Sequence, residues 1–179
     1  MRLDLEIRRL SQRDVCGGFS AGSTPDDARL DEFLRRYAKQ NERRQMSATS
    51  LAWAETAIAG FVTVVPGTVD PVRIEEHVKG LSRHAVPVLV LARMATDARF
   101  QKQGVGDRLL REVVFPKAIE LADGFGCVGV WVDAKPGAVL FYGRYGFVAL
   151  GPDVAATEPR PMFLALGTIR AGAPRAALT

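Results

Sequence analysis

Apolar residues follow two different periods along this chain, and the periods predict its elements. Residues 3–7 alternate apolar and charged side chains, which predicts a strand with one buried face. Thr24 and Pro25, followed by two acids, form a helix start, and helical spacing continues to about residue 44. The predicted buried stripe of this helix consists of Leu30, Phe33, Leu34 and Tyr37.

Strand patterns dominate the middle of the chain. Residues 47–56 and 57–65 predict an antiparallel pair joined by a tight turn, and Pro66-Gly67 predicts the end of the second strand. Residues 86–91 are almost continuously apolar, which is typical of a strand buried on both faces at the centre of a sheet.

The second half alternates helices and strands. Residues 105–124 predict a long helix, and Pro116 interrupts its hydrogen bonding near Glu112. The mixed pattern between the middle strands predicts only a short helix near residues 74–79. The remaining predicted elements are strands at 127–132, 148–150 and 162–169, and a helix between Pro136 and Gly146.

This order predicts one α/β (α+β) domain. A mixed, mostly antiparallel twisted sheet would carry helices on both faces. A chain of 179 residues is long enough to bury one substantial core, and no linker divides it. We expect the domain to span residues 1–170, with a small, polar, mobile tail at 171–179.

Composition narrows the function classes. A net charge of +4 favours an anionic partner, such as coenzyme A or nucleic acid. Cys16 and Cys127 are isolated, which predicts no disulfide and a cytoplasmic location. His77 and His84 are too few and too poorly spaced for zinc, so no metal is expected. No signal peptide or bilayer-length apolar run stands in the sequence, so no membrane association is expected.

The candidate chemistry begins directly after the central strand. There Gln101-x-x-Gly104-x-Gly106 precedes a helix, so backbone N–H groups at a helix N-terminus face the end of a buried strand. Phosphate suits such a position, and glycine lets the backbone approach it. The Rossmann fingerprint fails because its third glycine is Leu109, and no Walker A motif follows. Alone, this pattern is more typical of a plain turn.

A second motif, Ala138-x-x-Phe141-Tyr142-x-x-x-Gly146-Phe147, follows about 30 residues later. In this order the two motifs resemble the GNAT N-acetyltransferase superfamily, over residues 86–147. The resemblance implies a splayed central strand pair that binds acetyl-CoA, with the first motif holding its pyrophosphate. The implied cofactor-binding residues are Met94, Ala95, Thr96, Gln101, Lys102, Gln103, Gly104, Val105, Gly106 and Phe141.

In GNAT enzymes the strand end pairs with the pantetheine amides. A main-chain N–H near Met94 would then stabilise the oxyanion. The sequence departs from many relatives after Cys127, where Asp133-Ala134 replaces an Asn that often contacts pantetheine.

The resemblance makes Tyr142 the candidate catalytic residue, as the general acid that protonates the departing thiolate. Without it, a tyrosine packed between Phe141 and Phe147 would be the favoured interpretation. Tyr145 is the next candidate by position, although it does not match the motif.

The acceptor is predicted to be an α-amine. No Asp or Glu lies in residues 86–94, where lysine acetyltransferases often carry a general base. At pH 7 about one α-amine in ten is neutral, against about one lysine amine in 2,500. A water chain to a remote carboxylate could replace the missing base.

Within the superfamily, residues 30–44 and 90–95 resemble the acetyltransferase toxins that pair with ribbon-helix-helix antitoxins and acetylate aminoacyl-tRNA. Such toxins are often homodimers, but the sequence shows no dimer face. The resemblance implies that basic residues grip tRNA phosphates. The candidates are Arg35, Arg36, Lys39, Arg43 and Arg93. The alternative for the four helix residues is an ordinary solvated helix face, and the alternative for Arg93 is a salt bridge.

The sequence leaves two other functions open. One is a GNAT enzyme that acetylates a small-molecule amine or a protein N-terminus. The other is a coenzyme A-binding module without activity, against which Tyr142 argues.

Overall fold

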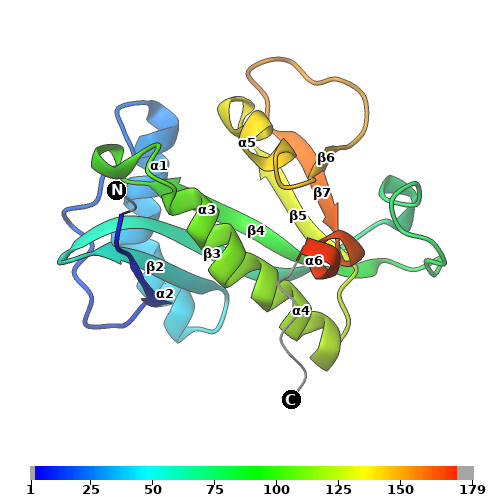
Figure 1. The fold of residues 1–179 in the computed structure, drawn as a ribbon, viewed down its shortest axis with the longest axis horizontal. Helices are drawn as coiled ribbons and strands as arrows, with labels where there is room; N and C mark the ends of the chain where they lie inside the picture. The colour runs from blue at the N-terminus through cyan, green and yellow to red at the C-terminus, as the bar shows by residue number, and fades with distance from the viewer. Residues whose placement is uncertain (1–2, 173–179) are drawn as a thin grey trace. The chain divides into compact units, whose positions relative to one another are not determined.

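A computed structural model of the chain describes residues 3–172 (Figure 1). It confirms the predicted α/β class and the mostly antiparallel sheet, whose seven strands follow the order β1-β2-β3-β4-β5-β7-β6. The parallel pair is β4 with β5. From residue 173 onward, the predicted tail lies outside the described residues. The strands are β1 (Glu6–Arg9), β2 (Ala48–Ala54), β3 (Ala57–Val69), β4 (Val86–Thr96), β5 (Gly129–Ala134), β6 (Val148–Ala149) and β7 (Arg160–Ala165).

The chain forms two compact units. The first comprises Met1–Val65 and Leu91–Pro116, and the second comprises Pro66–Val90 and Lys117–Thr179. Strands β3 and β4 and helix α4 (Phe115–Gly124) each contribute residues to both units. The chain therefore passes from one unit to the other within regular elements and not through a loop linker.

The first helix of unit 1 begins where the sequence predicts it. The Thr24 hydroxyl accepts a hydrogen bond from the Asp27 amide, and the Asp27 carboxylate accepts one from the Thr24 amide, which completes a capping box. Helix α1 (Pro25–Glu32) continues through the π-helical segment η1 (Phe33–Tyr37) into α2 (Ala38–Arg43).

The π-helical segment corrects the predicted buried stripe. Tyr37 was expected inside, but 47% of it is exposed, and Ala38 is fully buried instead. A π turn contains one residue more than an α turn, so every later side chain moves by one position around the helix. Periodicity read at 3.6 residues per turn therefore fails after Phe33.

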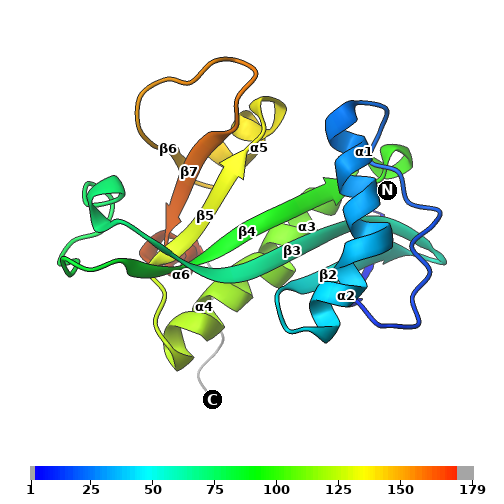
Figure 2. The same cartoon turned by 180° about the vertical axis from the view of Figure 1, so that it is seen from behind.

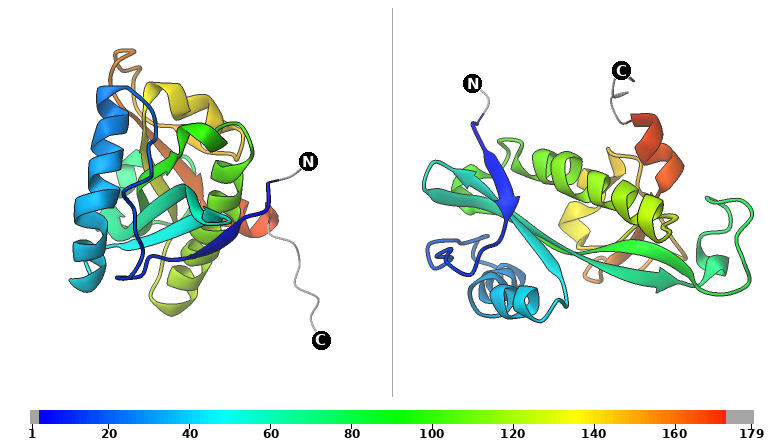
Figure 3. Two further views of the ribbon diagram at one scale, coloured as in Figure 1. Left: turned by 90° about the vertical axis from the view of Figure 1, so that its left-hand side faces the viewer. Right: turned by 90° about the horizontal axis from the view of Figure 1, so that it is seen from below.

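Helices cover both faces of the strands in unit 1 (Figure 3). On one face Phe33 and Leu34 pack with Leu51 and Phe61 in a buried cluster. On the other face lies the helix that begins with α3 (Val105–Leu109). It continues as the π-helical segment η4 (Leu110–Val114). The predicted helical layers on both faces are confirmed here.

The long helix is irregular just before Pro116. The Phe115 amide bonds to the Leu110 carbonyl, five residues back, before α4 (Phe115–Gly124) resumes α-helical geometry. The irregular turn contains Glu112, where Pro116 was predicted to interrupt the helix.

Strand β3 overturns one sequence expectation. Pro66-Gly67 was predicted to end it, yet it continues to Val69. The register with β2 ends at the Ala48–Val64 pair, so Pro66 lies beyond the last β2 partner. Proline lacks a donor, but a strand edge without a neighbour does not require one.

Unit 2 is built around β5 and β7, which lie side by side in antiparallel register (Figure 2). Leu89 and Val90 of β4 pair in parallel with Val130 and Trp131. Buried side chains on this sheet include Ile74, Trp131 and Phe163. Besides η2 (Pro71–Arg73) and most of α4, the helical elements of the unit include η5 (Pro136–Ala138), α5 (Val139–Gly143) and α6 (Leu166–Gly172).

Two further expectations were wrong in unit 2. The strand predicted at residues 162–169 ends at Ala165, because the chain then turns into helix α6. The helix predicted near residues 74–79 is a 3₁₀ turn, η2 (Pro71–Arg73), followed by non-helical turns. In these turns the His77 and Val78 amides donate to the Ile74 carbonyl. No helix within residues 3–172 has the length and apolar character needed to cross a bilayer.

Gly60 allows α3 to approach β3 closely. A Cβ at this position would lie 2.7 Å from Val105 Cγ1 and 2.9 Å from the Ala95 carbonyl oxygen. Both separations are shorter than real Cβ contacts, so a larger residue must displace the start of α3 or the end of β4.

We therefore expect Gly60→Ala to lower the free energy of unfolding by about 1–3 kcal/mol, because the packed contact has no room for a methyl group. Urea denaturation followed by circular dichroism measures this change. The control is Gly167→Ala in α6, where a Cβ meets nothing within 4 Å and the helix favours alanine. Equal stability of the two variants would contradict the packing argument.

Candidate active site

The glycine loop, residues 101–104, ends in a helix start without a side-chain cap. Gly104 is the N-cap of α3 and has φ 84°, which favours glycine, and Lys102 is also left-handed at φ 60°. Helix α1 is capped by Thr24, whereas no side chain caps α3. The first N–H groups of α3 therefore remain available to an anion.

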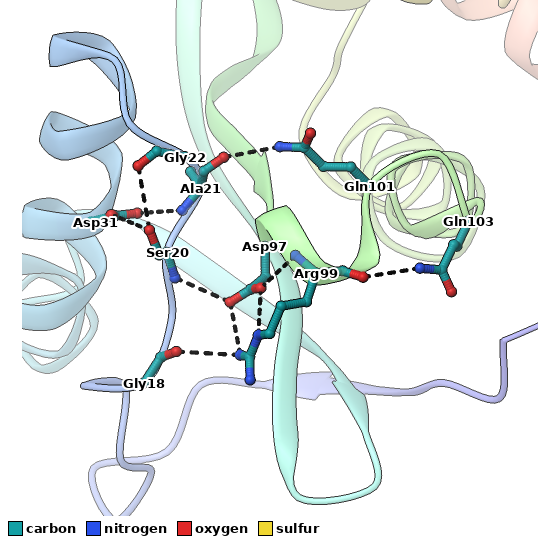
Figure 4. Close-up of polar contacts among 9 residues, drawn as sticks. All are labelled: Gly18, Ser20, Ala21, Gly22, Asp31, Asp97, Arg99, Gln101 and Gln103. Atoms are coloured by element: carbon teal, nitrogen blue, oxygen red, sulfur yellow. Dashed lines mark hydrogen bonds and ion pairs between the residues drawn. The ribbon is translucent and has the colours of Figure 1, made fainter.

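Two side chains of the glycine loop brace the loop. The Gln101 side-chain amide donates to the Ala21 carbonyl at 2.9 Å, and that of Gln103 donates to the Arg99 carbonyl at 3.0 Å (Figure 4). Their amide nitrogens are thus engaged by the protein. Main-chain N–H groups, and not these side-chain nitrogens, are the donors that the loop offers to a phosphate.

The end of β4 presents main-chain groups on one edge. The Asp97 amide donates to the Ala59 carbonyl of β3 at 2.9 Å, and the Ala95 carbonyl also faces β3. Because backbone groups alternate along a strand, Met94 and Thr96 direct theirs to the opposite edge. Main-chain groups of this kind are those with which an extended ligand can pair along a strand.

Asp97 is a residue that the sequence interpretation missed. It is 1% exposed and accepts hydrogen bonds from Ser20 and Arg99. Burial alone would raise the pKa of this carboxyl, but the bonds from Arg99 and from the Ser20 and Arg99 amides hold its pKa below the usual range. The sequence signal that could have revealed it is an Asp directly after the central strand, with Arg99 two residues later. Its partner, Ser20, lies 77 residues away in sequence.

Tyr142 belongs to unit 2 and is 5% exposed on helix α5. Its ring packs edge-on against Phe141 at 5.2 Å and Phe147 at 5.3 Å. Burial raises the pKa of its phenol, so the hydroxyl keeps its proton. Among residues 3–172, no hydrogen bond involves this hydroxyl. A protonated phenol that no other group engages is able to donate its proton to a ligand.

Two other candidate positions of unit 2 are Phe141 and the pair Asp133–Ala134. Phe141 also contacts Tyr145, with ring centroids 5.2 Å apart, so it lies between the two tyrosines. Asp133 and Ala134 are paired in the β5–β7 ladder with Pro161 and Arg160. The Asp133 side chain is exposed.

The basic helix is partly neutralised. Arg35 approaches the Asp31 carboxylate at 4.0 Å, and Arg36 approaches Glu32 at 3.5 Å. Within the described residues, no ion pair involves Lys39 or Arg43. The strongest candidates for phosphate contacts on this helix are therefore Lys39, which is half-buried, and Arg43, which is exposed.

Arg93 links this helix to the cofactor strand. Its guanidinium carbon lies 4.0 Å from the centre of the Phe33 ring, a cation–π contact between β4 and η1. The alternative to an RNA-binding role for Arg93 was a salt bridge, but none of the ion pairs in residues 3–172 includes this residue.

Unit 1 thus brings together the β4 end, the glycine loop, the basic helix and Arg93, whereas Phe141 and Tyr142 belong to unit 2. Residues 3–172 contain no cluster of three His, Cys, Asp or Glu residues that could hold a metal. Unit 1 offers main-chain donors for an anion at the start of α3, and unit 2 offers the protonated phenol of Tyr142.

Comparison with known proteins gives three findings. A curated tRNA-acetylating toxin of Mycobacterium tuberculosis is 28% identical over 165 residues, which cover 92% of this chain and 93% of the toxin. The AtaT structure complexed with acetyl-methionyl-tRNAfMet superposes with a TM-score of 0.79 at 21% identity, covering 94% of this chain and 98% of AtaT. A tyrosine-to-phenylalanine variant of AtaT, bound to the C-terminus of the antitoxin AtaR and acetyl-CoA, gives 0.72 at 20% identity, covering 94% and 97%.

The two structures, at such low identity, show the fold alone. The sequence model of the Acetyltransferase (GNAT) domain matches residues 47–149, more than half of the chain. This match spans the strand end, the uncapped start of α3 and the helix of Tyr142. The chain therefore belongs to the GNAT acetyltransferase family and is an N-acetyltransferase whose cosubstrate is acetyl-CoA.

Proposed function

We propose that this protein transfers an acetyl group from acetyl-CoA to the α-amine of an aminoacyl-tRNA, and that it acts as a toxin by blocking translation. The observation that carries this proposal is the contact of Arg93 with Phe33. It joins the strand that would hold the thioester to the helix that carries Lys39 and Arg43. A basic surface that leads to the acetyl donor suits an RNA whose end carries the acceptor amine.

Three similar proteins support the same proposal. The curated relative acetylates tRNA, and one structural neighbour holds an acetylated methionyl-tRNA. Another holds acetyl-CoA with the C-terminus of an antitoxin. We extend these properties to this chain. We also propose a ribbon-helix-helix antitoxin and a second copy of the chain as partners, on the resemblance of residues 30–44 and 90–95 to acetyltransferase toxins.

The carboxylates in unit 1 support an α-amine as acceptor. Asp97 is buried, fully hydrogen-bonded and of lowered pKa, so it is a poor general base. Asp31 is likewise buried and accepts from the Ala21 amide and the Ser20 hydroxyl. An α-amine has a pKa of about 8, so a usable fraction of it is neutral without a general base, whereas a lysine amine needs a base to remove its proton.

In the proposed reaction, the amine nitrogen attacks the thioester carbon and the C–S bond breaks. Main-chain N–H near Met94 stabilises the oxyanion. Tyr142 gives its phenolic proton to the departing sulfur, and the amine loses a proton to solvent. The phenol then recovers a proton from water. Because burial keeps Tyr142 protonated, the donor form is present throughout the neutral pH range.

A second candidate is an enzyme that acetylates a small-molecule amine or a protein N-terminus. The ion pairs of Arg35 and Arg36 favour it, since they remove cations that an RNA surface would use. We also propose a cytoplasmic location, which fits the buried, unbridged thiols of Cys16 and Cys127.

Tyr142→Phe is expected to lower kcat by about 10²–10⁴-fold, because the proton donor is lost. KM for acetyl-CoA and the unfolding temperature should stay nearly unchanged, since the ring contacts with Phe141 and Phe147 remain. Mass spectrometry of charged tRNA after incubation with acetyl-CoA measures the reaction.

Tyr145→Phe is the matched control, because this neighbouring ring is half-buried beside the same Phe141. It should retain most of the activity. Unchanged turnover in Tyr142→Phe would remove Tyr142 from the mechanism. Acetylation of small amines with charged tRNA left untouched would select the second candidate function.

Arg43→Ala is expected to weaken tRNA binding and to reduce the slope of log K against log salt by about 1, because one phosphate contact is lost. Affinity for coenzyme A should not change. Filter binding over a range of salt concentrations measures the slope. Arg170→Ala in unit 2 is the control, and an identical slope change in both variants would argue against a specific phosphate contact.

Induced expression of the wild type is expected to arrest bacterial growth, and Tyr142→Phe is expected to relieve the arrest. Growth curves, with immunoblots for equal protein levels, check this. Normal growth with active wild-type enzyme present would contradict the toxin function but not the acetyltransferase activity.

A further inference from the structure

A network of hydrogen bonds ties residues 18–22 to residues 97–103. The Ser20 amide donates to Asp97 Oδ2 at 3.1 Å, and the Ala98 amide donates to the Ser20 carbonyl at 2.8 Å. Arg99 Nη2 donates to the Gly18 carbonyl at 3.3 Å, and Gln101 donates to the Ala21 carbonyl (Figure 4). We call these two segments and their hydrogen bonds the Asp97 clamp.

Asp97 is the centre of the clamp. Its Oδ1 accepts from the Arg99 amide at 3.0 Å and from Arg99 Nε at 2.8 Å. Its Oδ2 accepts from Arg99 Nη2 at 2.9 Å in addition to the Ser20 amide. An ionised carboxylate with these donors, almost fully buried, holds both segments in one arrangement.

The clamp is also fixed from the side of helix α1. Asp31, 5% exposed, accepts from the Ala21 amide at 2.7 Å and from the Ser20 hydroxyl at 3.3 Å. Residues 18–22 are therefore held between a buried carboxylate of α1 and the segment that starts the glycine loop. Residues 18–22 therefore cannot shift without breaking hydrogen bonds to Asp31 or to residues 97–101.

The side-chain bonds of Gln101 and Gln103 hold a glycine loop that is otherwise open to solvent. Residues 101–104 are exposed, α3 has no side-chain cap, and a Cβ on Gly104 would meet nothing within 4 Å. Donors for an anion are effective only when they are already in place, since ordering them on binding costs free energy. The hydrogen bonds at the start of the loop are what can keep it ordered.

We propose that Asp97 is a positioning residue for the cosubstrate: through Arg99 and residues 18–22 it holds the glycine loop in the conformation that binds the coenzyme A diphosphate. It touches no reacting atom. The proposal rests on the cofactor role of the glycine loop, a part of the proposed function, and is independent of the acceptor amine.

The test compares Asp97→Asn with Asp14→Asn. Asp14 is also a buried carboxylate, 8% exposed, and within the described residues its side-chain hydrogen bonds come from Arg8 and from the Ser11 amide, not from residues 97–103. The two substitutions therefore remove the same kind of interaction from different places. Circular dichroism and thermal unfolding report the loss of stability in each.

Binding of coenzyme A is measured by calorimetry and binding of pantetheine, which lacks the diphosphate, by NMR titration. In Asp97→Asn we expect the Kd for coenzyme A to rise about tenfold or more, and the Kd for pantetheine to stay unchanged. In Asp14→Asn both values should stay unchanged. Arg99→Gln, at an exposed residue, should reproduce the selective loss if Asp97→Asn does not fold.

An equal loss for both probes would reduce Asp97 to a structural residue and overturn the proposal, as would an unchanged Kd for coenzyme A. Wild-type protein that binds coenzyme A but leaves charged tRNA unmodified would contradict the proposed function alone. Wild-type protein that binds no coenzyme A would overturn both.

Discussion

The backbone N–H groups at the start of helix α3 have no side-chain partner, and the candidate anion site of unit 1 depends on this. Helix α1 shows the usual solution, in which Thr24 and Asp27 satisfy the first turn. At α3 the N-cap is Gly104 in a left-handed conformation, which leaves room for a ligand instead of a side chain. Gly60 then lets this helix start lie directly against β3.

An uncapped helix start is a weak point unless neighbouring residues hold it. Here the bonds centred on Asp97 supply that support, and they reach back to Asp31 on the helix that carries Lys39 and Arg43. The buried carboxylates of unit 1 are thus used to position backbone. Under the proposed mechanism the general acid comes instead from Tyr142, whose apolar surroundings keep it protonated.

The sequence and the structure disagree where one residue changes the local geometry. The π-helical segment η1 moved Tyr37 outward and Ala38 inward, which no 3.6-residue period could predict. Pro66 was read as a strand end because its missing donor was assumed to matter, yet β3 has no β2 partner there. Ile74 was predicted to begin a helix, but it directly follows the 3₁₀ turn η2 and is buried in the core of unit 2 from that position.

By itself the sequence determined the fold class, the start of α1, the glycine motif before α3 and the aromatic motif around Tyr142, because periodicity, capping and glycine geometry are local properties. It could not show that Ser20 meets Asp97, that Arg93 lies over Phe33, or that Asp31 and Glu32 neutralise Arg35 and Arg36. The first two depend on residues far apart in sequence, and all of them on side-chain directions. Only the tertiary structure decides these, since each is the outcome of packing that no single segment specifies.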